Sequence, residues 1–241
     1  MARILCVHVI NDEATVYASY WCQLIAQDAR RVGHDVRELT GAMVTEQGLR
    51  SAIEGFQPHL VVFAGHGSSN IFTGVGYQTV MRACTNDQIM AGSSGLFISC
   101  LTGQILVPSM VSKGALAAQG YLKEYIWMVD GSGRPATDRY AASFTRTLVD
   151  AAAVILRGGS WQGWYSTFQR ISQEEIDKWA NSTDIVAPSV VMSLRQNKTS
   201  AVISGAGTII EDGVDPGMQV PIIENPVLPI ILGVAALSII K

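Results

Sequence analysis

The chain has 241 residues, of which 48% are hydrophobic and 15% are charged. This composition is too apolar for a disordered chain and supplies enough apolar side chains for a sizeable core. A net charge of -3 without a basic cluster argues against nucleic acid as a partner. The four cysteines form no CxxC pair, so the sequence predicts neither a zinc site nor a disulfide framework and favours a reducing compartment.

The first part of the chain alternates short apolar runs with segments of helical periodicity. We expect strands and helices to follow one another over residues 4–10, 17–32, 36–39, 45–56 and 60–64. The first run leads directly into Asn11, Asp12 and Glu13 without a small-residue cleavage pattern, so it is typical of a strand and not of a secretion signal. Right-handed crossovers between such strands predict a doubly wound, mostly parallel sheet with helices on both faces.

The same alternation continues in the second part of the chain. The expected elements are a strand at 96–99, a helix at 106–113, a strand at 115–120, a loop at 130–135, and helices at 137–156 and 160–180. The loop at 130–135 is long enough to border a substrate cleft. Residues 189–194 and 201–204 are expected to form a closing hairpin.

Two of the predicted strands are followed directly by residues with reactive side chains. The run 60–64 is followed by Gly65, His66 and Gly67, and the run 96–99 is followed by Cys100. Parallel sheets present their sites where the strands end, so the two runs should bring an imidazole and a thiol to one edge. A cysteine hydrolase needs both groups, because a thiolate attacks the carbonyl and a base accepts the thiol proton.

The order of these motifs, a hydrophobic strand then His-Gly and later a hydrophobic strand then Cys, resembles the caspase-like cysteine peptidases. The spacing, together with Cys100-Leu101-Thr102-Gly103 and the later Lys113-Gly114-Ala115 and Gly120-Tyr121, is closest to the gingipain and legumain branches. The resemblance covers roughly the element order of residues 1–165. It implies a three-layer caspase-like fold and a peptide or protein substrate, without a metal or another cofactor.

The resemblance also implies a role for individual residues. His66 is expected to be the general base, Cys100 the nucleophile, and the amides of Gly67 and Cys100 the oxyanion hole. Independently of the resemblance, Gly65 and Ser99, which precede the two catalytic candidates, are expected to contact the substrate, because a glycine without a Cβ lets a substrate backbone approach closely. We interpret the other histidines as structural.

The loop after the first strand lines the specificity pocket in this family, and here it carries carboxylates. A carboxylate in a partly desolvated pocket favours a cationic side chain. Asp12 is therefore the first candidate, and Asp130 the second, for a pocket that selects Arg or Lys before the scissile bond. The alternative is that Asp12 caps the following helix. Ile98 stands where caspases and legumains place a polar pocket residue, which argues against Asp or Asn specificity.

The last part of the chain has a different composition. We expect a catalytic domain over residues 1–210, a linker over 211–225 and an uncharged hydrophobic segment over 226–241. As a helix, the uncharged residues 226–240 would span roughly 22 Å, less than the ~30 Å hydrocarbon core, so membrane anchoring and docking on protein both stay open. For localisation, we expect a membrane-associated protein with an intracellular catalytic domain. Whether the protein forms a homo-oligomer stays open.

Three functional classes follow from these patterns. The first is a cysteine endopeptidase with a His-Cys dyad that cleaves after basic residues. The second is a catalytically silent caspase-like subunit whose hydrophobic segment mediates membrane or subunit association. The third, a small-molecule binder at the same sheet edge, is weakest because no Gly-rich phosphate loop follows the first strand.

Overall fold

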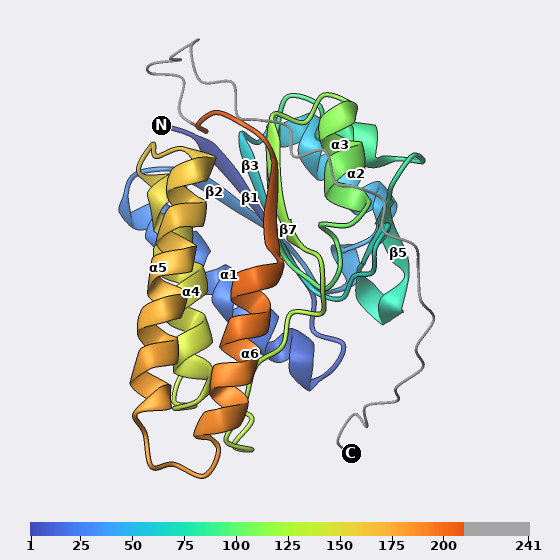
Figure 1. Cartoon of the computed structure of the whole chain (residues 1–241). Coiled ribbons are helices and arrows are strands. Elements are labelled where there is room, and N and C mark those ends of the chain that lie inside the picture. Colours follow the sequence, from blue (N-terminus) through green and yellow to red (C-terminus); the bar gives the residue numbers. More distant parts are fainter. Residues whose placement is uncertain (210–241) are drawn as a thin grey trace, which may run out of the picture.

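The computed structural model describes residues 1–209, which form three layers around a central sheet of six strands (Figure 1). The elements in chain order are β1 (Arg3–His8), α1 (Glu13–Arg31), β2 (Asp35–Thr40), α2 (Glu46–Phe56), β3 (Leu60–Ala64), β4 (Ile71–Thr73), β5 (Thr79–Arg82), β6 (Ser94–Ile98), α3 (Leu106–Ser112), β7 (Ala117–Tyr121), α4 (Ala141–Leu156), α5 (Trp161–Ala180), α6 (Ala187–Ser200) and β8 (Ala201–Gly205). The expected domain boundary at 210, the linker 211–225 and the hydrophobic segment 226–241 lie outside the described residues.

The sheet has the predicted doubly wound and mostly parallel architecture. Its strand order is β2-β1-β3-β6-β7-β8, in which the first five strands are parallel and β8 pairs antiparallel with β7. The order places β3 and β6 side by side in the middle, with β1 on the other side of β3. The loops that follow β1, β3 and β6 therefore leave the sheet at the same edge.

The continuous apolar runs arise because each central strand is buried on both faces. In β3, Leu60 and Val62 point into a core with α1, α4, α5 and α6, whereas Val61 and Phe63 point into a second core with α2 and α3. Figure 1 shows the corresponding arrangement, with α4, α5 and α6 on one side of the sheet and α2 and α3 on the other. The two cores fix the sheet from both sides.

A short hairpin of β4 and β5, which the sequence patterns did not predict, lies over the second core. The rings of Phe63 and Phe97 stack with centroids 4.5 Å apart, and Phe72 of β4 contacts both rings edge-on at 5.2 and 6.2 Å. Such aromatic contacts add to the area that they bury. The hairpin is therefore anchored to the two strands that precede His66 and Cys100.

The predicted closing hairpin is wrong in its first half. Residues 187–200 form helix α6 rather than a strand, and only 201–205 form a strand, which pairs with β7 instead of with residues 189–194. Pro188 lies in the first turn of the helix, where its missing N–H has no intrahelical partner to lose. Val190 and Leu194 then bury one face of the helix against the core shared with α5.

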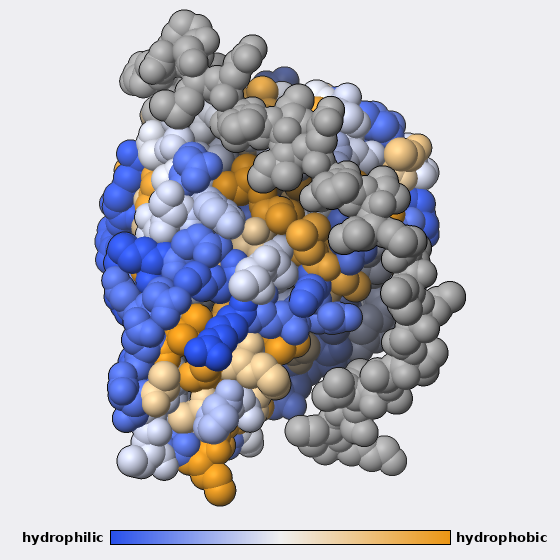
Figure 2. Space-filling view, in the orientation of Figure 1, coloured by the Kyte–Doolittle hydropathy of each residue, from blue (hydrophilic) through white to orange (hydrophobic). Residues whose placement is uncertain are grey.

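The surface of this side of the molecule is mixed. Figure 2 shows hydrophilic side chains over much of the helix-rich part of the view and apolar side chains gathered near its centre, where the orange-red strand β8 runs in Figure 1. Within residues 1–209, no helix combines the length and the apolar character that crossing a membrane requires.

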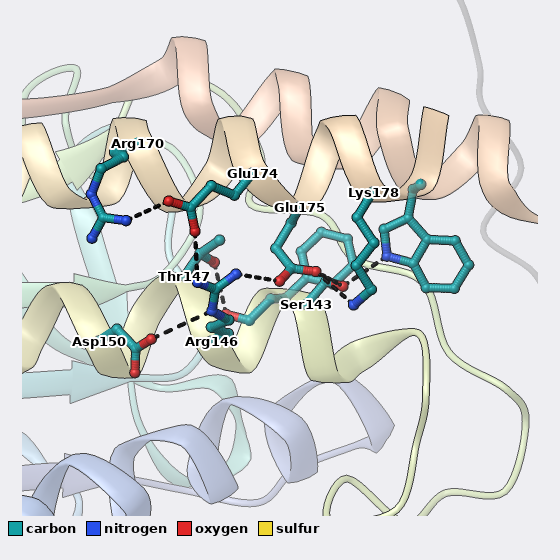
Figure 3. Close-up of polar contacts among 10 residues, drawn as sticks. Ser143, Arg146, Thr147, Asp150, Arg170, Glu174, Glu175 and Lys178 are labelled. Atoms are coloured by element: carbon teal, nitrogen blue, oxygen red, sulfur yellow. Dashed lines mark hydrogen bonds and ion pairs between the residues drawn. The ribbon is translucent and has the colours of Figure 1, made fainter. Parts of the chain in front are cut away.

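A network of charged side chains joins α4 to α5 (Figure 3). The Arg146 guanidinium donates to Glu175 Oε1 at 2.7 Å and to Glu174 Oε2 at 2.6 Å. The buried Glu175 also accepts from Ser143 Oγ at 2.6 Å and from Lys178 Nζ at 2.9 Å. Burial by itself raises the pKa of Glu175, but the bonds from Ser143, Lys178 and Arg146 outweigh it and hold that pKa below its usual value.

We therefore predict that Glu175→Gln destabilises the fold at pH 7 by about 1–3 kcal/mol, because charge-assisted bonds to a buried carboxylate are lost. Since the folded pKa is lowered, the carboxylate stabilises the protein above its unfolded pKa of about 4.3, and this contribution disappears as the pH falls through the folded pKa. Urea unfolding from pH 3 to pH 7 should show a weaker pH dependence in the variant. Glu174→Gln, at an exposed position of the same network, should cost less than about 1 kcal/mol. Equal stabilities of Glu175→Gln and the wild type at pH 7 would contradict the prediction.

Candidate active site

The candidate site lies at the edge of the sheet where β1, β3 and β6 end. Ala64 of β3 pairs with Ile98 of β6, so His66 and Cys100 each lie two residues beyond paired positions on adjacent strands. His8 of β1 pairs with Ala64, and the loop that carries Asp12 follows it. The sheet thus brings the three sequence candidates Asp12, His66 and Cys100 to one edge.

Gly67 is the position where the His66 loop touches the Cys100 loop. A Cβ atom added to Gly67 would lie 2.3 Å from Ser99 Oγ and 3.1 Å from the Cys100 carbonyl oxygen. Both distances are shorter than ordinary van der Waals contact. Only glycine allows this approach, so the residue sets how closely the two loops pack.

The two predicted substrate contacts beside this position are buried. Gly65 donates its N–H to the Ile98 carbonyl at 3.3 Å and packs against the ring of Phe72. The Ser99 side chain is 2% exposed, and its hydroxyl has no hydrogen-bond partner among the described residues. Gly65 and Ser99 are thus both buried in the structure, and their contact with a substrate stays a prediction.

Asp12 binds His66 directly. The His66 Nε2 atom lies 2.6 Å from Asp12 Oδ2, and both side chains are 35% exposed. The same carboxylate caps α1, because its Oδ1 atom accepts from the Thr15 N–H and the Thr15 hydroxyl, each at 2.9 Å. The helix-capping alternative for Asp12 is thus confirmed, and a bond to the candidate base is added to it.

The hydrogen bonds on Asp12 keep it ionised. Partial burial by itself raises the pKa of Asp12, but the bonds from Thr15, His66 and Tyr77 outweigh that effect and lower the pKa to about 2. In a neutral imidazole, an ionised Asp12 favours the tautomer with the proton on Nε2, and Nδ1 is then the acceptor. Among residues 1–209, Nδ1 has no hydrogen-bond partner. His66 can therefore receive a proton on this atom.

Cys100 is partly buried. Its thiol lies 3.9 Å from the Tyr125 carbonyl oxygen and packs against the first core. Burial raises the pKa of the thiol above its ordinary value, and this effect outweighs the bond to Tyr125. The next residue, Leu101, has a φ of 62°, a left-handed backbone conformation that residues other than glycine rarely adopt. The chain therefore turns sharply immediately after the thiol.

Several backbone amides at the site are without acceptors among the described residues. The N–H groups of Gly67 and Cys100 make no hydrogen bond there, and neither do those of the preceding residues His66 and Ser99. The residues that follow are bonded: Ser68 N–H donates to the Ile71 carbonyl, and Leu101 N–H donates to the Lys123 carbonyl. Unpaired amides beside a nucleophile are the donors that an oxyanion hole requires.

Asp130 lies apart from this group of residues. It is exposed in the loop that follows β7, and its carboxylate accepts from the Ser132 N–H at 2.8 Å. Its own N–H donates to Asp138 Oδ2, which also accepts from the Tyr17 hydroxyl of α1. No contact within the described chain joins Asp130 to His66 or Cys100. The loop is nevertheless tied to α1, the helix that Asp12 caps.

A second triad-like chain of contacts is inaccessible. Ser19 Oγ lies 2.7 Å from His8 Nδ1, and His8 Nε2 lies 3.1 Å from Glu38 Oε2. The His8 and Ser19 residues are only 4% and 1% exposed, so no substrate can reach the hydroxyl. This geometry agrees with a structural role that joins β1, β2 and α1.

Within the described residues, no group of three or more His, Cys, Asp or Glu side chains could hold a metal ion.

Tyr77 is the residue of this edge that the sequence patterns did not identify. Its hydroxyl donates to Asp12 Oδ2 at 3.0 Å, and its ring lies 5.5 Å from that of His66. Tyr77 belongs to the turn between β4 and β5, in a segment without a clear hydrophobic period.

No family model matches the chain, and no curated protein matches it significantly. The fold is similar to solved structures of a cysteine proteinase. The complex of Porphyromonas gingivalis RgpB pro- and mature domains aligns with a TM-score of 0.56 and 14% identity, over 86% of this chain and 48% of that chain. The Arg-specific cysteine proteinase gingipain R (RgpB) aligns with a TM-score of 0.57 and 13% identity, over 86% and 47%. The chain thus spans about half the length of these proteins, and the likeness confirms the predicted caspase-like fold.

We predict that Gly67→Ala destabilises the protein by about 1–3 kcal/mol, because the added methyl group must displace Ser99 or the Cys100 backbone. The same displacement should slow labelling of Cys100 by thiol reagents. Thermal unfolding and mass spectrometry measure the two effects. Gly55→Ala is the matched control, since a Cβ there meets nothing within 4 Å and the position lies in α2. An unchanged Tm in Gly67→Ala would show that the loops are not packed as described.

We also predict that alkylation of Cys100 by iodoacetamide becomes faster as the pH rises, with a midpoint above the ordinary thiol value of about 8.5. The reason is that burial disfavours the thiolate, so the resting thiol is neutral. Measurements in a Cys84→Ser background remove the exposed cysteine. A midpoint below about 7.5 would instead indicate a thiolate and imidazolium pair already formed at rest.

Proposed function

We propose that this protein is a cysteine peptidase in which Cys100 is the nucleophile and His66 is the general base and acid. The observation that carries the proposal is the contact of His66 Nε2 with the ionised Asp12, which leaves Nδ1 as acceptor on the loop that packs against the Cys100 loop. The similarity of the fold to a cysteine proteinase supports the same assignment.

In the proposed reaction, His66 Nδ1 takes the proton of the Cys100 thiol while the sulfur attacks the carbonyl carbon of the scissile peptide bond. The developing oxyanion accepts hydrogen bonds from the Gly67 and Cys100 amides. When the tetrahedral intermediate collapses, the carbon–nitrogen bond breaks and His66 returns the proton to the leaving amine. Water, activated by His66, then hydrolyses the thioester and restores the thiol.

The role of Asp12 in this proposal differs from the expected one. Its two oxygens already accept from Thr15, His66 and Tyr77, so little of the carboxylate is available to a substrate cation. We propose that Asp12 orients His66, and that recognition of a basic residue falls to the exposed carboxylate of Asp130. The description of gingipain R as Arg-specific supports testing basic substrates first.

The test uses the full chain and reporter peptides that differ only in Arg, Lys, Ala or Asp before the scissile bond. Cys100→Ala and His66→Ala should each abolish cleavage, and the double variant should be no worse, because the two residues act as a unit. Asp12→Asn retains a capping side chain but should lower kcat by about a hundred-fold on every peptide, as loss of base orientation requires. Asp130→Asn should lower kcat/KM only for the Arg and Lys peptides. Asp35→Asn, at the start of β2, is the neutral control.

Each result bears on one part of the proposal. Cleavage that survives Cys100→Ala would exclude Cys100 as the nucleophile. A fall in Asp12→Asn confined to basic peptides would return the specificity role to Asp12. A wild-type protein that neither cleaves peptides nor reacts with an Arg-directed acyloxymethyl ketone would support the alternative of a catalytically silent caspase-like subunit.

A further inference from the structure

Tyr77 occupies an unusual position for a large side chain. It lies at the end of the short 3₁₀ turn Val75–Tyr77 between β4 and β5, with a φ of 62°, and Gly76 before it has a φ of 61°. Left-handed conformations are unfavourable for residues with a Cβ, so glycine would suit the position better. The side chain is also 55% exposed, so it adds little to the hydrophobic core. Neither the backbone nor the core explains why a tyrosine is present.

The contacts of Tyr77 converge on the candidate catalytic pair. Its hydroxyl donates to Asp12 Oδ2 at 3.0 Å, the same oxygen that lies 2.6 Å from His66 Nε2. Its ring lies beside the His66 ring, with centroids 5.5 Å apart and planes inclined by 36°. The bond to Asp12 raises the pKa of the Tyr77 hydroxyl, so Tyr77 stays a donor. One side chain thus contacts both members of the pair.

The turn that carries Tyr77 is hydrogen-bonded to Asn11, the residue that precedes Asp12. Asn11 Nδ2 donates to the Gly74 carbonyl at 2.9 Å, and the Gly76 N–H donates to Asn11 Oδ1 at 3.1 Å. The Val75 N–H donates to the Val44 carbonyl at 3.1 Å, which adds a third attachment. The left-handed conformation at Tyr77 is therefore imposed by a well-bonded turn.

We propose that Tyr77 is a positioning residue of the peptidase site, which fixes the Asp12 carboxylate with a second hydrogen bond and restricts the His66 ring with its own ring. Restricting both groups keeps His66 in the Nε2–H tautomer, with Nδ1 available to the Cys100 thiol. Tyr77 does not take part in proton transfer. This inference rests on the proposed function, and it explains the strained and exposed tyrosine that the proposed reaction leaves unused.

The experiment compares Tyr77→Phe, Tyr77→Ala and Tyr77→Gly in the full chain, with Tyr165→Phe of α5 as control. Tyr77→Phe removes only the bond to Asp12, and kcat should fall several-fold with KM unchanged. Tyr77→Ala removes the ring as well, and kcat should fall by about ten-fold or more. Tyr77→Gly suits the left-handed backbone, so its Tm should exceed that of Tyr77→Ala while its kcat stays low. This combination separates a positioning role from a structural one.

A second measurement does not depend on activity. In protein labelled with ¹⁵N-histidine, the His66 signals should report the Nε2–H tautomer in the wild type and in Tyr165→Phe, and a mixture of tautomers in Tyr77→Ala. Unchanged kcat and unchanged His66 signals in Tyr77→Ala would overturn the proposal, as would a change in KM alone, which would indicate a direct substrate contact. If the wild type shows no peptidase activity, the proposed function fails, and the His66 signals still decide whether Tyr77 orders the pair.

Discussion

The register between β3 and β6 is the constraint on which the rest of the candidate site depends. Because Ala64 pairs with Ile98, the imidazole and the thiol follow their strands by the same number of residues. A slip of one residue would turn every side chain of one strand to the opposite face and would place Phe63 and Phe97 in different cores. The stacked phenylalanines, with Phe72 against them, oppose such a slip. Packing in the second core thus sets the geometry at the edge.

The Asp12 carboxylate couples local structure to chemistry. One oxygen accepts from the Thr15 N–H in the first turn of α1, and the other oxygen binds His66. The helix N-terminus also favours a negative charge, so the two roles support each other. A residue that caps a helix is fixed in its rotamer by the helix itself. The candidate base is therefore oriented by the secondary structure of a neighbouring element.

Some of these features could be predicted from the sequence, because they depend on local patterns. The fully apolar runs before His66 and Cys100 identify buried parallel strands, and parallel strands imply a common edge. The capping role of Asp12 is a property of the residues just beyond it. Tyr77 could not be found in this way, since its contact with Asp12 joins residues 65 positions apart through an irregular turn. Helix α6 was missed because the β-branched pair Val190 and Val191 favours a strand locally, whereas packing against α5 decides the outcome.

The crossover connections of the sheet have a consequence for the order in which the site forms during folding. Asp12 and His66 are 54 positions apart, and Cys100 follows only after the β4–β5 hairpin and β6 have been synthesised. Pairing of parallel strands that are far apart in sequence is slow compared with local helix formation, and strand pairing at the centre of the sheet must precede the contact between the loops. A partly synthesised or partly folded chain therefore contains the thiol and the imidazole but not their alignment.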